Sequence, residues 1–193
     1  MLELKARSTH ASRWVSSAQF PISNSLLRIE ERPMRAIIRL QGARNDERFE
    51  SAVQAIVKLS LPGNGAYLVN GSRSIAWVGP SEWLLFAELQ EEAELLSSLN
   101  QALSGVFASA TLMSDARICL TVQGPAAVDF LAKGCSVDID PNAFPPGRVI
   151  ATRMAQQPSM VIHESPGSYA LYFESSLAAF TLNWVIECAA EFV

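Results

Sequence analysis

An internal repeat restricts the possible folds of this chain more than any other feature of its sequence. Residues 35–42 read Arg-Ala-Ile-Ile-Arg-Leu-Gln-Gly, and residues 117–124 read Arg-Ile-Cys-Leu-Thr-Val-Gln-Gly. Residues 80–88 begin with Pro and carry an aromatic residue three positions on, Leu five on and Glu eight on, and residues 166–174 share that pattern. Because both motifs recur in the same order, the chain is predicted to contain two similar halves.

The two halves have the same predicted order of elements. Apolar runs predict strands for the repeated segments and for two further segments in each half, and helical spacing of apolar residues predicts a helix after each Gln-Gly and after each Pro motif. Asn45 is expected to cap the first of these helices, with Asp46 and Glu47 in its first turn. Each half is therefore β-α-β-β-β-α. The two further strands are predicted at 66–69 and 75–78 in the first half, and at 149–154 and 160–163 in the second.

One such half cannot cover both faces of its own sheet. We therefore expect an α+β fold in which duplicated, ferredoxin-like halves pack as one domain. A chain of 193 residues is long enough for a core of that size. The domain is predicted to span residues 26–193, with halves of about 26–105 and 106–193, and residues 1–25 are expected to form an N-terminal arm.

Charge is distributed unevenly along the chain. Residues 1–48 contain nine Lys/Arg and five Asp/Glu, whereas residues 49–193 contain six and fourteen. The net charge of −4 argues against nucleic acid as the main partner, because phosphate binding needs a basic face. The sequence shows neither a membrane-spanning run nor a secretory signal, so we expect a cytoplasmic protein with no membrane association. The basic N-terminal quarter either docks on an acidic partner or lies on its own body.

No group of residues has the spacing of a catalytic or metal site. The three cysteines are far apart, and Cys135 is interpreted as a buried turn thiol, although a cation two residues before it could lower its pKa. His10 falls in the arm, and His163 ends an apolar strand, where an edge or turn histidine is favoured over a catalyst. We therefore expect no catalytic, cofactor-binding or metal-binding residue in this chain.

Contact with another protein is the alternative use of its unusual segments. The loop 138–148 contains three prolines and presents Phe144 beside Arg148. A stiff loop of this kind loses little side-chain entropy on docking, although Phe144 could instead pack onto the chain's own sheet. The candidate interface residues are Trp14, Phe20, Phe144, Pro145, Pro146 and Arg148.

Several motifs resemble one known family. They are Trp77-Val-Gly-Pro-Ser-Glu-Trp-Leu-Leu85, Leu120-Thr-Val-Gln-Gly-Pro125, Leu131-Ala-Lys-Gly-Cys135, Phe144-Pro-Pro-Gly147 and the ending around Trp184. In order and spacing they are similar to the gamma subunit of heterotetrameric sarcosine oxidase, from about residue 26 to the C-terminus. That family is similar in fold to the folate-binding portion of glycine-cleavage T-protein aminomethyltransferases.

The resemblance implies a role inside a complex. In that family, the complex oxidises an N-methyl amino acid, sarcosine, to glycine and transfers the methyl carbon to tetrahydrofolate. FAD, FMN, NAD and tetrahydrofolate are carried by other subunits, so this chain would bind no cofactor itself. The implied partners are alpha, beta and delta subunits, mainly alpha. The gamma chain is the small accessory member, and its type is also similar to a chain of N-methylglutamate dehydrogenase, which leaves the substrate open.

Departures from the catalytic relatives indicate a noncatalytic chain. Those enzymes have an acidic pair where residues 153–163 contain no carboxylate, and an Asn-containing turn where this chain has Glu174-Ser-Ser176. Their strand-initial Asp corresponds to Leu112. Methylene transfer would lack its general acid/base here. The other hypotheses are a stand-alone tetrahydrofolate-binding protein, which the same departures disfavour, and self-association of the isolated chain through its partner surface.

Overall fold

The computed structural model describes residues 19–192 of the chain. Short 3-10 turns link several of the elements, and no described helix is long and apolar enough to cross a membrane. The strands are β1 (Ile22–Ser23), β2 (Arg28–Glu31), β3 (Ala36–Gly42), β4 (Tyr67–Asn70), β5 (Arg73–Gly79), β6 (Glu82–Ala87), β7 (Ala108–Leu112), β8 (Arg117–Gln123), β9 (Arg148–Met154), β10 (Gln157–Ser165) and β11 (Ser168–Glu174), and the helices are α2 (Glu47–Val57), α3 (Glu92–Ala102), α4 (Ala127–Ala132) and α5 (Ala178–Ala189).

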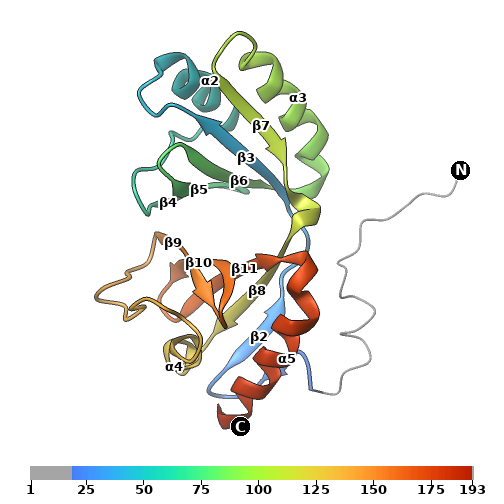
Figure 1. The fold of residues 1–193 in the computed structure, drawn as a ribbon, viewed down its shortest axis with the longest axis vertical. Coiled ribbons are helices and arrows are strands. Elements are labelled where there is room, and N and C mark those ends of the chain that lie inside the picture. The colour runs from blue at the N-terminus through green and yellow to red at the C-terminus, as the bar shows by residue number, and fades with distance from the viewer. Residues whose placement is uncertain (1–18, 193) are drawn as a thin grey trace, which may run out of the picture. The chain divides into compact units, whose positions relative to one another are not determined.

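The chain divides into two compact units, each containing one antiparallel sheet (Figure 1). The first-half unit comprises Arg35–Ser114 and Gly147–Ile150. The second-half unit comprises the described residues before Arg35, together with Asp115–Pro146 and the residues from Ala151 onward. Two antiparallel sheets with helices confirm the predicted α+β class.

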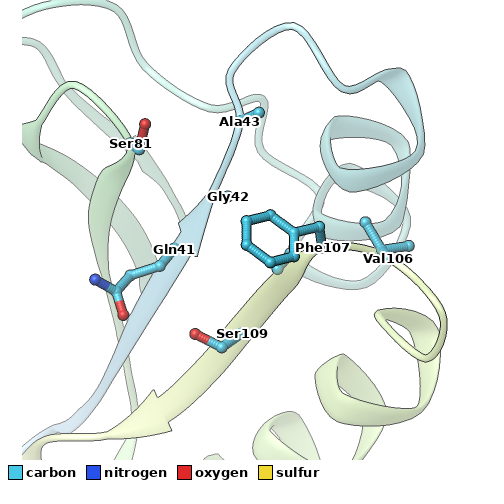
Figure 2. Close-up of a pocket in the computed structure, with 8 residues that line it drawn as sticks. Gln41, Gly42, Ala43, Ser81, Val106, Phe107 and Ser109 are labelled. Carbon is cyan, nitrogen blue, oxygen red and sulfur yellow. The ribbon is translucent and has the colours of Figure 1, made fainter.

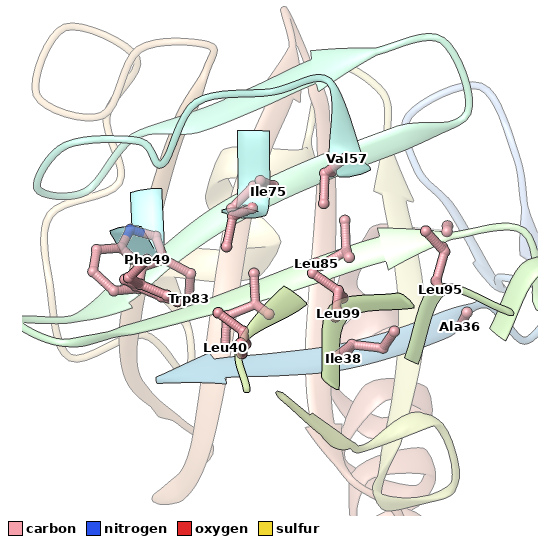
Figure 3. Close-up of a cluster of buried hydrophobic side chains, with 13 residues drawn as sticks. Ala36, Ile38, Leu40, Phe49, Val57, Ile75, Trp83, Leu85, Leu95 and Leu99 are labelled. Carbon is pink, nitrogen blue, oxygen red and sulfur yellow. The ribbon is translucent and has the colours of Figure 1, made fainter. Parts of the chain in front are cut away.

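The first-half unit has a sheet in the order β4-β5-β6-β3-β7, with α2 and α3 contributing to its core. Alternate side chains of β3 and β6 enter the core, as expected for strands with one face on the helices. Trp83 is fully buried there and donates its indole N–H to the Pro62 carbonyl at 3.0 Å. Its ring lies 5.8 Å from that of Phe49 on α2 (Figure 3). Trp83 is therefore a core residue.

The second-half unit has a sheet in the order β1-β2-β8-β11-β10-β9. Leu120 of β8 lies opposite Leu171 of β11, and both side chains are fully buried. Phe130 of α4 is also fully buried, and its ring lies 5.4 Å from that of Trp184 on α5. The predicted order β-α-β-β-β-α is present in both units.

A fifth strand in each sheet is the main difference from the predicted order. The strand β7 follows α3 and pairs with β3, so Gln41 lies opposite Ser109, although the sequence placed β7 in the second half. The N-terminal strand β2 pairs with β8, so Gln123 lies opposite Arg28. Since Gln41 and Gln123 are equivalent in the repeat, β2 occupies in one sheet the place that β7 occupies in the other. The strand β1, which lies inside the stretch expected as an arm, pairs with β2.

The start of α2 also differs from the prediction. Its N-cap is Asp46, whose carboxylate accepts hydrogen bonds from the main-chain N–H of Arg48 at 2.9 Å and of Phe49 at 3.4 Å. The residue expected as the cap, Asn45, lies one position too far from these free N–H groups.

Candidate docking surfaces

Two of the five predicted contact residues that the structure describes are buried within the chain. Phe20 is 6% exposed and Phe144 is 5% exposed, so both aromatic side chains are buried within the chain. Trp14 lies outside the described residues. Pro145, Pro146 and Arg148 are exposed and remain candidates.

The aromatic stack around Phe144 explains its burial. The ring of His163 lies 6.0 Å from that of Phe144 and 4.2 Å from that of Tyr169, and both pairs are stacked. His163 Nδ1 lies 2.6 Å from the Phe144 carbonyl oxygen, which can only accept, so Nδ1 carries the hydrogen. His163 is thus a fully enclosed residue of β10 that anchors the Pro-rich loop, not an edge or turn histidine.

The exposed residues of the Pro-rich loop are divided between the two units. Pro145 and Pro146 belong to the second-half unit, whereas Arg148 begins β9 and belongs to the first-half unit. Arg148 forms an isolated bridge with Ala66, and a Cβ atom added to Gly65 would lie 2.8 Å from the Arg148 guanidinium. Glycine at position 65 therefore gives the Arg148 side chain room beside β4.

A hollow at one end of the first-half sheet was not predicted from the sequence. It has a volume of about 500 Å³ and is lined by Gln41, Gly42, Ser81, Val106, Phe107 and Ser109, among others (Figure 2). Phe107 is 97% exposed, which is unusual for a phenylalanine in a well-packed unit. The only sequence signal for this exposed ring was the presence of an aromatic residue in the segment between a predicted helix and the second repeat. An exposed aromatic beside a hollow is typical of a protein contact.

A second hollow lies in the second-half unit. It has a volume of about 450 Å³, and Trp184 and the 48% exposed Phe180 of α5 line it together with the turn between β9 and β10. In that turn Ala155 and Gln156 have φ values of 51° and 64°, a conformation that residues other than glycine adopt at a cost. This hollow therefore combines apolar side chains with a backbone held in an uncommon geometry.

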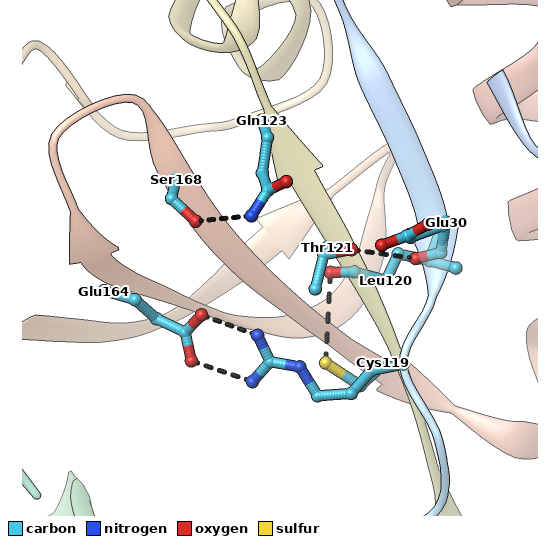
Figure 4. A network of polar contacts seen from close by, with 8 residues as sticks. Glu30, Cys119, Leu120, Thr121, Gln123, Glu164 and Ser168 are labelled. Carbon is cyan, nitrogen blue, oxygen red and sulfur yellow. Dashed lines mark hydrogen bonds and ion pairs between the residues drawn. The ribbon is translucent and has the colours of Figure 1, made fainter. Parts of the chain in front are cut away.

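The most prominent polar contact in the second-half unit is structural. Arg32 donates two hydrogen bonds to the Glu164 carboxylate, at 2.8 and 2.6 Å (Figure 4). Hydrogen bonding to Glu164 raises the pKa of Arg32, so its guanidinium stays charged. Nearby, Thr121 donates its hydroxyl to the Glu30 carbonyl at 3.2 Å. These bonds attach β2 and the residue after it to the rest of the sheet.

The shifted thiol pKa values within residues 19–192 give no sign of an activated cysteine nucleophile. Burial raises the pKa of the Cys135 thiol, which is the opposite of what a reactive thiol requires. Burial also raises the pKa of Cys188, and Cys119 is buried. Among residues 19–192 no group of three or more His, Cys, Asp or Glu side chains is arranged to hold a metal ion.

The fold defines the structural class of the chain. It is similar to the glycine cleavage system aminomethyltransferase T from Bartonella henselae, with a TM-score of 0.65 and 12% identity over 84% of this chain and 46% of that one. This similarity shows the fold alone, and it confirms the aminomethyltransferase-like architecture that the family resemblance implied.

Sequence comparison identifies the family. The profile of the sarcosine oxidase, gamma subunit family matches residues 41–191. A sarcosine oxidase subunit gamma from Corynebacterium sp. (strain U-96) is 32% identical over 145 residues, which cover 74% of this chain and 69% of that relative. A subunit of the same name from Arthrobacter sp. is 31% identical, covering 74% and 70% of the two chains. The chain therefore belongs to the sarcosine oxidase gamma subunit family.

A solved structure agrees with this assignment. The chain is similar to one in the heterotetrameric sarcosine oxidase from Corynebacterium sp. U-96 in complex with pyrrole 2-carboxylate, with a TM-score of 0.87 and 26% identity. The similarity covers 97% of this chain and 96% of that one.

Proposed function

We propose that this chain is the noncatalytic accessory subunit of a heterotetrameric complex that oxidises sarcosine to glycine and passes the methyl carbon to tetrahydrofolate. Its membership of the gamma subunit family is the observation that carries this proposal. The exposed Phe107 beside its hollow supports it, because an accessory subunit needs apolar surface for its partners.

The proposal places the redox and folate chemistry on other subunits, with FAD, FMN, NAD and tetrahydrofolate as the cofactors of the complex. The chemistry of the described residues supports a passive role. His163 is enclosed by a ring stack and its Nδ1 faces a carbonyl oxygen, and burial raises the pKa of Cys135. Residues 153–163 offer no carboxylate that could read the nitrogen atoms of a pterin.

The proposed partners are alpha, beta and delta subunits, with alpha providing the main contact. Pro145 and Pro146 of the second-half unit are exposed and form one proposed contact region, and Arg148 of the first-half unit is a further exposed candidate. The hollow lined by Phe107 forms another. The proposed location is the cytoplasm, where cell fractionation should recover the tagged chain.

Omission of the chain from the complex tests this function. Coexpression of the native alpha, beta and delta subunits with this chain should yield a complex that oxidises sarcosine, and coexpression without it should lower the yield of assembled complex. Full assembly and full activity without the chain would contradict an accessory structural role.

Two other functions give different results in simple assays. A subunit of an N-methylglutamate dehydrogenase would support oxidation of N-methylglutamate in preference to sarcosine by the assembled complex. A stand-alone folate-binding protein would bind tetrahydrofolate at micromolar concentration as the purified chain. We expect neither result.

A further inference from the structure

The outer edge of β7 differs from the other sheet edges described in residues 19–192. Natural proteins protect edge strands by making them short, by covering them, or by placing charges or proline on them. The edge strand β1 has two residues, and β4 is covered where Tyr67 donates to the Gly147 carbonyl at 2.8 Å. The third edge, β9, carries Arg148 and Arg153. In contrast, β7 has five residues, Ala-Ser-Ala-Thr-Leu, with neither charge nor proline.

The register of β7 shows which peptide groups face outward. Residue pairs in antiparallel strands alternate between pairs that exchange main-chain hydrogen bonds and pairs whose peptide groups point outward. Met113 N donates to the Ile37 carbonyl at 2.7 Å, and the Ile37 N–H points to the same side, where it donates to Ser114 Oγ at 2.9 Å. The peptide groups of Met113 and Ile37 therefore face each other, as in a pair of the first kind. Ala110 lies three residues earlier, opposite Leu40. The N–H and C=O of Ala110 therefore point away from β3, toward the open edge.

The other unit shows what this edge can accept. Ser109 lies opposite Gln41, and Arg28 lies opposite the equivalent Gln123. The residues that follow them, Ala110 of β7 and Ile29 of β2, are therefore equivalent. Ile29 lies opposite Ile22 of β1, which pairs antiparallel to β2. The second-half sheet thus has a sixth strand at the place where the first-half sheet ends in β7.

The surroundings of β7 indicate the chemistry of an incoming strand. The exposed ring of Phe107 and the hollow beside it lie at the start of β7, where an apolar side chain would be buried (Figure 2). A Cβ atom added to Gly105 would lie 3.8 Å from the Arg48 guanidinium. Since Arg48 has no carboxylate partner among the described residues, it can pair with an acidic side chain that arrives next to Phe107.

We propose that an extended segment of a partner subunit adds to β7 as the sixth strand of this sheet, placing an apolar side chain in the Phe107 hollow and an acidic side chain near Arg48. Main-chain hydrogen bonds give such strand addition its affinity, and the hollow gives specificity. This inference rests on the proposed function, since it takes its partner from the complex.

Amide hydrogen exchange at single-residue resolution tests the inference directly. In the purified full chain, the amides of Ala110 and Leu112 should exchange quickly because they face the open edge, whereas the amide of Thr111 faces β3. In the assembled complex, exchange at Ala110 should slow by on the order of tenfold or more. Thr111 serves as the internal control and should change little.

Each other outcome of the exchange experiment overturns the inference. If the complex assembles and the Ala110 amide still exchanges quickly, strand addition is refuted and the proposed function is unaffected. Failure of the wild-type chain to join any complex refutes the proposed function itself. Slow exchange in the purified chain that depends on concentration assigns the edge to a second copy. Slow exchange that is independent of concentration and lost on deletion of residues 1–18 assigns it to the chain's own N-terminal segment.

Two variants with matched controls complete the test. Ala110→Pro removes the outward N–H without removing a hydrogen bond to β3 and should weaken assembly about tenfold, whereas Ala110→Ser keeps the N–H and should assemble normally. Phe107→Ser should also weaken assembly, whereas Val69→Ser, at a 59% exposed residue of β4, should not. If Ala110→Pro fails to fold, the Phe107 and Val69 variants still decide the question. Equal assembly by both would contradict the inference.

Discussion

The two Gln-Gly motifs of the repeat contain glycine for different physical reasons, and alanine substitutions should separate these reasons. A Cβ atom at Gly42 would lie 2.8 Å from the ring of Phe49, which is a side chain that can shift. A Cβ atom at Gly124 would lie 2.4 Å from the main-chain oxygen of Leu26, and Gly124 has a φ of 120°. Gly71 has a φ of 60° with no atom near the Cβ position, so it reports backbone strain alone.

The expected costs follow from these contacts. Gly71→Ala should cost about 1 kcal/mol of the free energy of unfolding, the lower end of the range for an uncommon backbone geometry. Gly42→Ala should cost about 1–3 kcal/mol by overpacking the core. Gly124→Ala should cost about 2–6 kcal/mol, because backbone strain adds to a clash with an atom that no side-chain rotation can move.

Urea denaturation of the wild-type chain and the three glycine variants measures these differences in the free energy of unfolding. The dependence of that free energy on urea concentration should have the same slope in all four chains. Because the chain has two compact units, amide exchange should assign each loss to a unit. The double variant Gly42→Ala/Phe49→Leu should lose less stability than the sum of its single variants, by about 0.5–3 kcal/mol. Equal small costs for Gly42→Ala and Gly124→Ala, or an additive double variant, would refute this reasoning.

Three further predictions concern the N-terminal strand, an ion pair and a thiol. Ile29→Ala should lower the free energy of unfolding, measured with urea, by about 2–5 kcal/mol, because Ile29 is fully buried in β2. The control Val69→Ala, at an exposed site, should lower it little. Equal losses would mean that β2 is not part of the core. The hydrogen bond from Arg73 lowers the pKa of Glu91, so the ionised carboxylate stabilises the fold above about pH 4.3. The wild-type chain should therefore be more stable than Glu91→Gln above that pH, and the difference should shrink as the pH falls below it. A difference in stability that does not change between about pH 3 and 7 would contradict the pairing. The raised pKa of Cys135 predicts slower alkylation than for an unfolded control at about pH 8.5, and faster alkylation would indicate an activated thiol.

Much of the fold could be predicted from the sequence because the predicted strands show clear apolar runs. The strand β2 could not, since Arg-Ile-Glu-Glu contains a single apolar residue and pairs with a strand about ninety residues away. Its place in the sheet depends on that distant partner and not on local pattern. Similarly, no strand was predicted at residues 108–112, which fell in the expected second half, because the repeat alone does not tell which sheet receives a fifth strand.

The contact residues were predicted less well for a related reason. The loop composition left open whether Phe144 is exposed or packs onto the chain's own sheet, and the stack with His163 and Tyr169, which only the folded sheet brings together, confirms the second alternative. Phe107 was missed because an aromatic residue between a helix and a strand is normally buried, and its exposure depends on the whole unit. Burial is set by tertiary packing, so short sequence motifs predict it poorly.

Native mass spectrometry of the complex purified through a tag on this chain tests the central claim most directly. The account predicts one species that contains a single copy of this chain together with one alpha, one beta and one delta subunit, and that oxidises sarcosine. Recovery of the chain alone, as a homodimer, or with proteins unrelated to those subunits would contradict the account.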